Sequence, residues 1–153
     1  MRIALFQPDI PQNTGTILRL AACLAVGVDI IEPCGFVFDD KRMRRAGMDY
    51  LDGVDLVRHP SWAAFSKVCE ETNRRVVLLT TKTTQPYTNF EFKPDDVLLM
   101  GQESAGVPDD VHNGTEARLT IPMAPEMRSI NVAMSAALVL GEALRQTSSF
   151  PNS

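Results

Sequence analysis

An amide and a guanidinium near the N-terminus are the first side chains that could act on a ligand. In the segment Asn13-Thr14-Gly15-Thr16-Ile17-Leu18-Arg19, a helix would place Arg19 about one and a half turns after Asn13. An arginine near a helix start can clamp a phosphate group. Asparagine is also a common N-cap, and an exposed helical arginine needs no ligand. Taken alone, these residues favour the capping role.

A second candidate is the loop Gly101–Pro108, which follows a strongly apolar run. Its glycines let the backbone approach a ligand and adopt positive dihedral angles. The loop does not match the Gly-x-Gly-x-x-Gly fingerprint of dinucleotide-binding folds or the Gly-Lys-Ser/Thr of a P-loop. Gln102 stands where the hydrolase elbow around Ser104 would need a glycine. The sequence therefore indicates a tight turn that could bind a ligand of another kind.

The third candidate joins Ile121-Pro122-Met123 to Arg128-Ser129-Ile130-Asn131, where a strand end and a polar helix start would meet. Ser129 or Asn131 could cap that helix, which is the usual role of such residues. The helix that follows carries many small side chains and an apolar stripe at helical spacing. The stripe is either core or a subunit interface.

Metal and disulfide chemistry have little support. His59 and His112 are isolated and lack His-x-x-x-His or His-Glu-x-x-His spacing. Cys23, Cys34 and Cys69 are odd in number and form no Cys-x-x-Cys pair. We expect no metal, and three reduced thiols buried in the packing.

The charge distribution allows a nucleic-acid partner in spite of a formal net charge of −4. Four basic residues fall within five positions, and we call them the basic cluster: Lys41, Arg42, Arg44 and Arg45. Such a cluster can form a local basic patch on an acidic protein. A solvated helix face paired with Asp39, Asp40 and Asp49 explains the same residues equally well.

Alternating structural elements must position these groups. Apolar runs predict strands at 3–6, 28–31, 54–57, 76–79, 97–100 and near 118–121, and helical periodicity predicts helices at 13–25, 41–47, 61–72 and 131–146. This β-α-β rhythm predicts an α/β fold, a parallel sheet flanked by helices on both faces, with ligands at the carboxyl ends of the strands. The 153 residues fit one domain, 1–153.

The start of the chain argues for a cytoplasmic protein. The first apolar run meets Gln7-Pro8-Asp9 before a signal-peptide core could form. No apolar run approaches the ~20 residues that a membrane-spanning helix needs. We therefore expect no membrane partner.

Taken in chain order, the three candidates resemble the three motifs of the SPOUT superfamily of RNA methyltransferases. The resemblance rests on Asn13-x-Gly15-x-x-x-Arg19, Gly101-x-Glu103-x-x-Gly106, and Ile121-Pro122-Met123 with Ser129-Ile130-Asn131-Val132. Segments 31–36 and 39–50 further resemble the minimal tRNA (cytidine/uridine 2′-O) methyltransferases that act at the wobble position. The resemblance spans nearly the whole chain.

The resemblance implies S-adenosylmethionine as methyl donor, a ribose 2′-hydroxyl of tRNA as acceptor, and no metal. It also implies a C-terminal deep trefoil knot over about 76–146 and a homodimer in which the second subunit completes the site. The implied cofactor residues are Leu79, Thr80, Gly101, Glu103, Ile121, Met123, Ser129 and Ile130. Catalysis would fall to Arg19, Asn13 and Asn131, and tRNA binding to the basic cluster.

Two other functions stay open. A SPOUT-fold RNA-binding dimer without activity would keep the architecture but lose the chemistry, and the retained Asn13, Arg19 and Glu103 argue against it. A flavodoxin-like or nucleotide-binding enzyme would share the β-α-β rhythm, but the phosphate fingerprints are missing. Gly141 and Ala133 depart from the family pattern, in which Tyr and Ser are common at these positions.

Overall fold

A six-stranded parallel sheet forms the centre of the molecule. The structure, a computed structural model, describes residues 1–45 and 50–152. The strands are β1 (Arg2–Phe6), β2 (Gly27–Ile31), β3 (Leu56–His59), β4 (Val76–Leu79), β5 (Val97–Met100) and β6 (Ala117–Leu119). They lie in the order β3-β2-β1-β5-β4-β6, and each neighbouring pair is parallel. The predicted parallel α/β sheet is confirmed.

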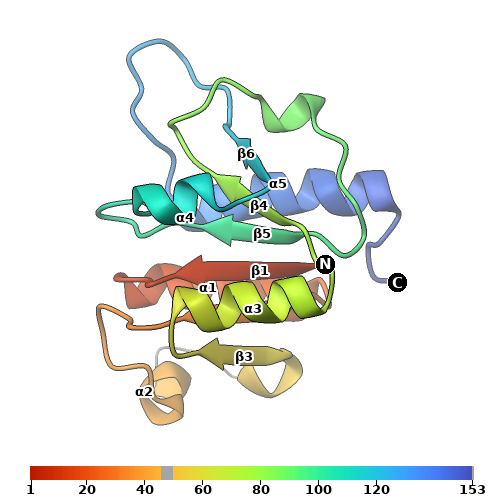
Figure 1. Cartoon of the computed structure of the whole chain (residues 1–153). Coiled ribbons are helices and arrows are strands. Elements are labelled where there is room, and N and C mark those ends of the chain that lie inside the picture. The colour runs from red at the N-terminus through yellow and green to blue at the C-terminus, as the bar shows by residue number, and fades with distance from the viewer. Residues whose placement is uncertain (46–49, 153) are drawn as a thin grey trace.

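Helices cover both faces of this sheet (Figure 1). They are α1 (Pro11–Cys23), α2 (Asp40–Arg45), α3 (Trp62–Glu71), α4 (Asp109–Asn113) and α5 (Val132–Thr147), with short 3-10 turns η1 (Leu51–Gly53) and η2 (Tyr87–Asn89). α1 and α5 pack against each other on one face, where Ile3, Val28 and Leu98 belong to the larger core. α3 and α4 cover the other face over Ala4 and Leu99.

The first helix begins earlier than the sequence predicts. Pro11 occupies its first turn, a position where proline lacks only an N–H that the helix does not use. The N-cap residue is therefore Ile10, which makes no side-chain cap bond. The prediction that Asn13 caps α1 is wrong. Its amide lies inside the first turn and is available for other contacts.

Two predicted strands are displaced. The predicted strand at 54–57 lies instead at Leu56–His59, because Val54 closes η1 through a bond from its N–H to the Leu51 carbonyl. The strand predicted near 118–121 is Ala117–Leu119. Thr120 leaves the sheet edge and pairs with the 85–87 segment, donating its N–H to the Gln85 carbonyl at 2.8 Å.

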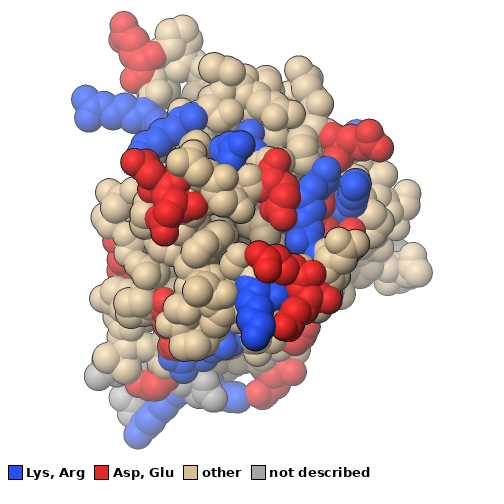
Figure 2. All heavy atoms as spheres, in the orientation of Figure 1, with Lys and Arg blue, Asp and Glu red and all other residues tan. Residues whose placement is uncertain are grey.

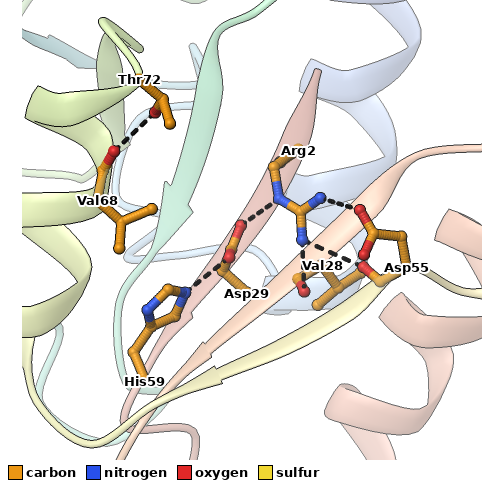
Figure 3. Close-up of polar contacts among 7 residues, drawn as sticks. All are labelled: Arg2, Val28, Asp29, Asp55, His59, Val68 and Thr72. Atoms are coloured by element: carbon orange, nitrogen blue, oxygen red, sulfur yellow. Dashed lines mark hydrogen bonds and ion pairs between the residues drawn. The ribbon is translucent and has the colours of Figure 1, made fainter.

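A cluster of polar side chains around Asp29 lies on the α3 face of the sheet (Figure 3), and it extends from Arg2 at the amino end of β1 to His59, the last residue of β3. Asp29 accepts bonds from Arg2 Nε at 2.6 Å and contacts His59 Nε2 at 2.8 Å. Arg2 also pairs with Asp55 and donates to the Val28 carbonyl at 3.1 Å. A cavity of about 180 Å³ adjoins this cluster beneath α3.

The three thiols differ in exposure. All are free, but Cys23 is exposed, Cys34 is intermediate and Cys69 is buried. The prediction that all three are buried is therefore confirmed only for Cys69: Cys34 is partly exposed, and α1 turns Cys23 away from the sheet. Burial raises the pKa of Cys69 to about 11, and burial with the nearby Glu32 raises the pKa of Cys34 to about 11.

Candidate active site

A cavity of about 430 Å³ opens at the carboxyl ends of β4, β5 and β6, beside the start of α1. Its volume falls within the roughly 300–1,000 Å³ of small-molecule sites. In a parallel sheet all strand ends of one kind share an edge, so loops far apart in sequence meet there. The cavity wall includes ten of the residues proposed from the sequence: Asn13, Leu79, Thr80, Gly101, Glu103, Ile121, Met123, Ser129, Ile130 and Asn131.

The turn after β5 forms one wall and has a defined shape of its own. Gln102 N–H donates to the Gly106 carbonyl at 2.8 Å, and Gly106 N–H returns a bond to the Gln102 carbonyl at 2.9 Å. Gly106 has φ of +66°, a conformation that favours glycine. A Cβ on Gly101 would lie 2.8 Å from the Gly106 carbonyl carbon. Only glycine at 101 lets the two ends of this turn come so close.

A chain of amide side chains joins three segments of the wall. Asn131 is the N-cap of α5, because its Oδ1 accepts from the N–H groups of Ala133 and Met134. Its Nδ2 donates to Asn13 Oδ1 at 3.0 Å, and Asn13 Nδ2 faces Glu103 Oε1 at 3.5 Å. The predicted capping of α5 by Asn131 is confirmed. The same side chain also orients Asn13.

Asp9, which the sequence did not single out, is bonded to the cofactor-loop candidate Glu103. Asp9 N–H donates to Glu103 Oε2 at 3.0 Å, and Glu103 N–H donates to Asp9 Oδ1 at 3.2 Å. Ser104 Oγ donates to the other oxygen of Asp9. Bonds from Glu103 and Ser104 lower the pKa of Asp9, whereas burial and the bond to Asp9 raise the pKa of Glu103. The two neighbouring carboxyls therefore have pKa values shifted in opposite directions.

Arg19 lies apart from these residues. It is exposed on α1, outside the cavity wall, and its guanidinium lies 5.0 Å from the centre of the Tyr50 ring. An arginine over an aromatic face gains a cation–π attraction. Within one chain, the structure does not bring Arg19 together with the cavity.

The basic cluster is only partly described. Lys41 is exposed on α2, and Arg44 is paired with Asp52 at 2.6 Å. The side chains of Arg42 and Arg45, and residue Asp49, lie outside what the structure describes. Figure 2 shows basic and acidic side chains intermingled over the described part of one face of the molecule. Charge density alone does not mark an RNA site on that face.

The cavity fits a ligand with both apolar and polar parts. Leu79, Ile121 and Met123 supply apolar surface. His112 also lines the cavity, and its Nδ1 is buried without a hydrogen-bond partner among the described residues. A buried nitrogen in this state gains free energy from a ligand or water that bonds to it. Among residues 1–45 and 50–152, no His, Cys, Asp and Glu side chains gather as metal ligands would.

Several wall residues were missed by the sequence analysis. They include Asp9 beside the cavity, and His112 and Thr120 within its lining. The position of Asp9 directly after β1, at the ligand-binding edge of the sheet, is a signal that could have identified it. His112 carries no such signal, because it belongs to α4, a helix of only five residues that the periodicity did not reveal.

Comparison with known proteins agrees with the geometry. Residues 1–141 match the SpoU rRNA Methylase family. The chain is 64% identical over 144 residues to a tRNA (cytidine(34)-2'-O)-methyltransferase of Beijerinckia indica, covering 94% of this chain and 90% of the relative.

Solved structures show the same likeness. One, described as "Structural insights into the 2-OH methylation of C/U34 on tRNA", has a TM-score of 0.88 and 36% identity, and covers 95% of this chain and 94% of that chain. The SpoU methyltransferase AviRb of Streptomyces viridochromogenes in complex with AdoMet has a TM-score of 0.85 and 27% identity. That match covers 95% of this chain and 60% of AviRb.

Proposed function

Because the chain belongs to the SpoU rRNA methylase family, we propose that it transfers a methyl group from S-adenosylmethionine to the ribose 2′-hydroxyl of the wobble cytidine or uridine of tRNA. The observation that carries this proposal is the cavity at the carboxyl edge, whose wall contains all three sequence motifs. Relatives named for this reaction cover nearly the whole chain. A tRNA substrate places the activity in the cytoplasm. Among the described helices, none is long and apolar enough to cross a membrane.

The cofactor would lie among the ends of β4, β5 and β6. Its adenine fits the apolar surface of Leu79, Ile121 and Met123, with Gly101, Glu103 and the 129–130 backbone beside its polar parts. Thr80 completes the wall at the end of β4. When bound, S-adenosylmethionine supplies an already activated methyl group, so the protein's contribution is alignment.

Arg19, Asn13 and Asn131 are the proposed catalytic residues. The bond from Asn131 to Asn13 holds the Asn13 amide at the cavity mouth, where it can orient the attacking ribose. In the transfer, the ribose oxygen would bond the methyl carbon while the carbon–sulfur bond of the donor breaks and leaves a thioether, and the hydroxyl proton would pass to solvent. A guanidinium has only hydrogen-bond donors and no acceptor, so we assign Arg19 to the substrate phosphate and to developing negative charge. Since Arg19 lies outside the cavity of its own chain, a second copy offers a way to bring the two together.

A homodimer is supported by an exposed apolar stripe along the start of α5. Ile130, Met134 and Leu138 recur every four residues, and their exposed fractions are 36%, 59% and 44%. This spacing places Met134 and Leu138 on one face of α5, and Ile130 lies just before the N-cap residue Asn131. We expect Met134→Lys with Leu138→Lys to give monomers in analytical ultracentrifugation. Val68→Lys on α3, at an equally exposed valine on the other face of the sheet, should leave the dimer intact.

The deep knot over about 76–146 and the single domain 1–153 are part of the same proposal. The chain must travel from the edge strand β6 to α5, which packs on α1 and β5. The connection between β4 and β5 lies along this route: Tyr87 N–H donates to the Thr120 carbonyl at 2.9 Å, and the Gln146 side chain bonds to the Phe90 and Phe92 backbone. These contacts support a threaded C-terminus.

The basic cluster on α2 is the proposed tRNA contact, duplicated in a dimer. Its binding should weaken steeply with salt, because phosphate contacts release counterions. Charge reversal of Arg42 and Arg45 should reduce tRNA affinity and flatten this salt dependence. Binding that salt does not change would contradict the assignment.

One experiment tests substrate, chemistry and position together. The protein is incubated with labelled S-adenosylmethionine and total tRNA, and new 2′-O-methyl nucleotides are mapped by mass spectrometry. We expect label at the wobble pyrimidine and nowhere else. Cofactor binding without transfer to any RNA would instead identify a protein that keeps the fold but lacks the activity.

A further inference from the structure

We propose that Asp9 is a positioning residue, which fixes the catalytic start of α1 against the cofactor turn 101–106. The inference rests on the proposed function for its consequence, but its geometry stands by itself. Asp9 and Glu103 are 94 residues apart and exchange two hydrogen bonds, each from a backbone N–H to the other's carboxyl. Such reciprocal bonds fix the separation and the orientation of two loops together.

The loop after β2 also packs closely against Asp9. Gly35 N–H donates to the Pro8 carbonyl at 2.9 Å. A Cβ on Gly35 would lie 2.7 Å from Asp9 Cβ and 2.9 Å from its Cα. Asp9 is therefore held between the loop after β2 and the turn after β5, and has little space to move away from either.

The turn after β5 does not need Asp9 for its own shape. The paired bonds between Gln102 and Gly106 close it internally, and the close approach of Gly101 to Gly106 involves no atom of Asp9. Loss of Asp9 should therefore leave the shape of the cofactor turn intact, but the position of this turn relative to the start of α1 would no longer be fixed. Asn13, two residues into that helix from Pro11, would lose its fixed distance to Glu103.

Methyl transfer depends strongly on this register, since a displacement of about 1 Å at a reacting group can cost about 10²-fold in rate. Binding of the cofactor depends mainly on the turn and the strand ends. Asp9 should thus affect kcat far more than cofactor affinity. A residue that only stabilised the fold would lower the melting temperature without separating these two quantities.

The test compares Asp9→Ala, Asp9→Asn and the wild-type protein. Asp9→Ala should lower kcat about 30- to 100-fold and change the Kd for S-adenosylmethionine, measured by calorimetry, less than about threefold. Asp9→Asn keeps an oxygen for the Glu103 N–H and should recover most of kcat. Gly35→Ala, which pushes Asp9 without removing it, should lower kcat as well.

Amide hydrogen exchange of Glu103 gives a measurement independent of activity. Its N–H donates to Asp9, so exchange should accelerate in Asp9→Ala and not in Asp9→Asn. If wild type transfers no methyl group but this pattern holds, the proposed function fails and the bond between the two loops stands. A kcat within threefold of wild type in Asp9→Ala, or exchange at Glu103 that does not change, overturns the positioning role.

Discussion

On the α3 face of the sheet, Arg2 and His59 both bond to Asp29, whereas beyond the carboxyl ends of β1 and β5 the side chains of Asp9, Asn13, Glu103 and Asn131 bond across loops around an open cavity. The first cluster is closed: the Asp29 and His59 side chains are only 7% and 6% exposed, and each has a partner (Figure 3). The wall of the cavity also includes His112, whose Nδ1 is buried without a hydrogen-bond partner among the described residues.

This difference separates a polar network that holds strands in place from one that awaits a ligand. A buried charge network gains little free energy over apolar packing, but removal of one member is costly. The cavity network carries its unsatisfied group and its exposed amides for binding. Substitutions in the Asp29 cluster should therefore change mainly the free energy of unfolding, and substitutions around the cavity should change mainly methyl transfer.

The largest effect is expected from Asp29→Ala. It leaves Arg2 and His59 without their shared partner, and such a loss costs about 3–5 kcal/mol. Chemical denaturation monitors the free energy of unfolding. Asp55→Ala is the matched control, because its side chain is 70% exposed and an exposed pair contributes at most about 1 kcal/mol. Methyl transfer per folded molecule should stay within about twofold of wild type in both, since the described lining of the cavity contains no residue of β2 or β3.

Arg19→Ala should have the opposite profile. We expect methyl transfer to fall at least about 10²-fold, as when a preorganised charge is removed from a transition state. The free energy of unfolding should change by about 1 kcal/mol or less, the worth of one exposed cation–π contact. Single-turnover kinetics and denaturation measure the two quantities. Lys67→Ala on α3 removes an exposed cation from the other face and should leave both unchanged. Activity within a few-fold of wild type in Arg19→Ala would remove Arg19 from the mechanism.

Gly101→Ala should weaken cofactor binding with a smaller change in free energy. The added Cβ would meet Gly106 backbone at 2.8 Å, so the turn must open. We expect the Kd for S-adenosylmethionine to rise about tenfold, or about 1.4 kcal/mol. Gly141→Ala is the control, because a Cβ there meets nothing within 4 Å. It should stabilise α5 by about 0.5–1 kcal/mol and leave the Kd unchanged. Equal affinities for the two variants would show that the turn does not contact the ligand.

The same contrast explains what the sequence could predict. Strands β1, β2, β4 and β5 are nearly continuous apolar runs, and their predicted bounds match the structure within one residue. β3 is displaced because it lies at the sheet edge, where Val57 and Arg58 are exposed and the apolar pattern is weak. The helix α4 has only five residues and spans too few turns to show a period.

The site was predictable only as far as the motifs reached. Family resemblance placed ten residues that the structure gathers around one cavity. It did not identify Asp9, whose importance comes from contacts with a loop 94 residues away. Local propensity also misplaced Asn13 as a cap, since Pro11 starts the helix first. Contacts between loops depend on the sheet order, which a single sequence does not specify.

Thiol labelling compares the Asp29 cluster with the loops near the active-site cavity and perturbs the protein least. Cys69 lines the cavity beside the Asp29 cluster at 5% exposure, Cys34 lies in the loop beyond the carboxyl end of β2, and Cys23 is exposed. The thiolate is the reactive form, so a pKa of about 11 should slow Cys34 and Cys69 at pH 8. As long as the pH is below the pKa of Cys34, each rise of one pH unit should increase the labelling rate at Cys34 about tenfold.

Mass spectrometry after iodoacetamide treatment should give the order Cys23, Cys34, Cys69. Cys69 should respond to pH less than Cys34, because its labelling requires the packing beneath α3 to open. Asp29→Ala should accelerate the labelling of Cys69 and leave the labelling of Cys34 unchanged, because only the Asp29 cluster loosens. Equal acceleration of labelling at both thiols would mean that the Asp29 cluster and the loops at the carboxyl ends of the strands open as one unit. The two polar networks would then not differ in their local stability.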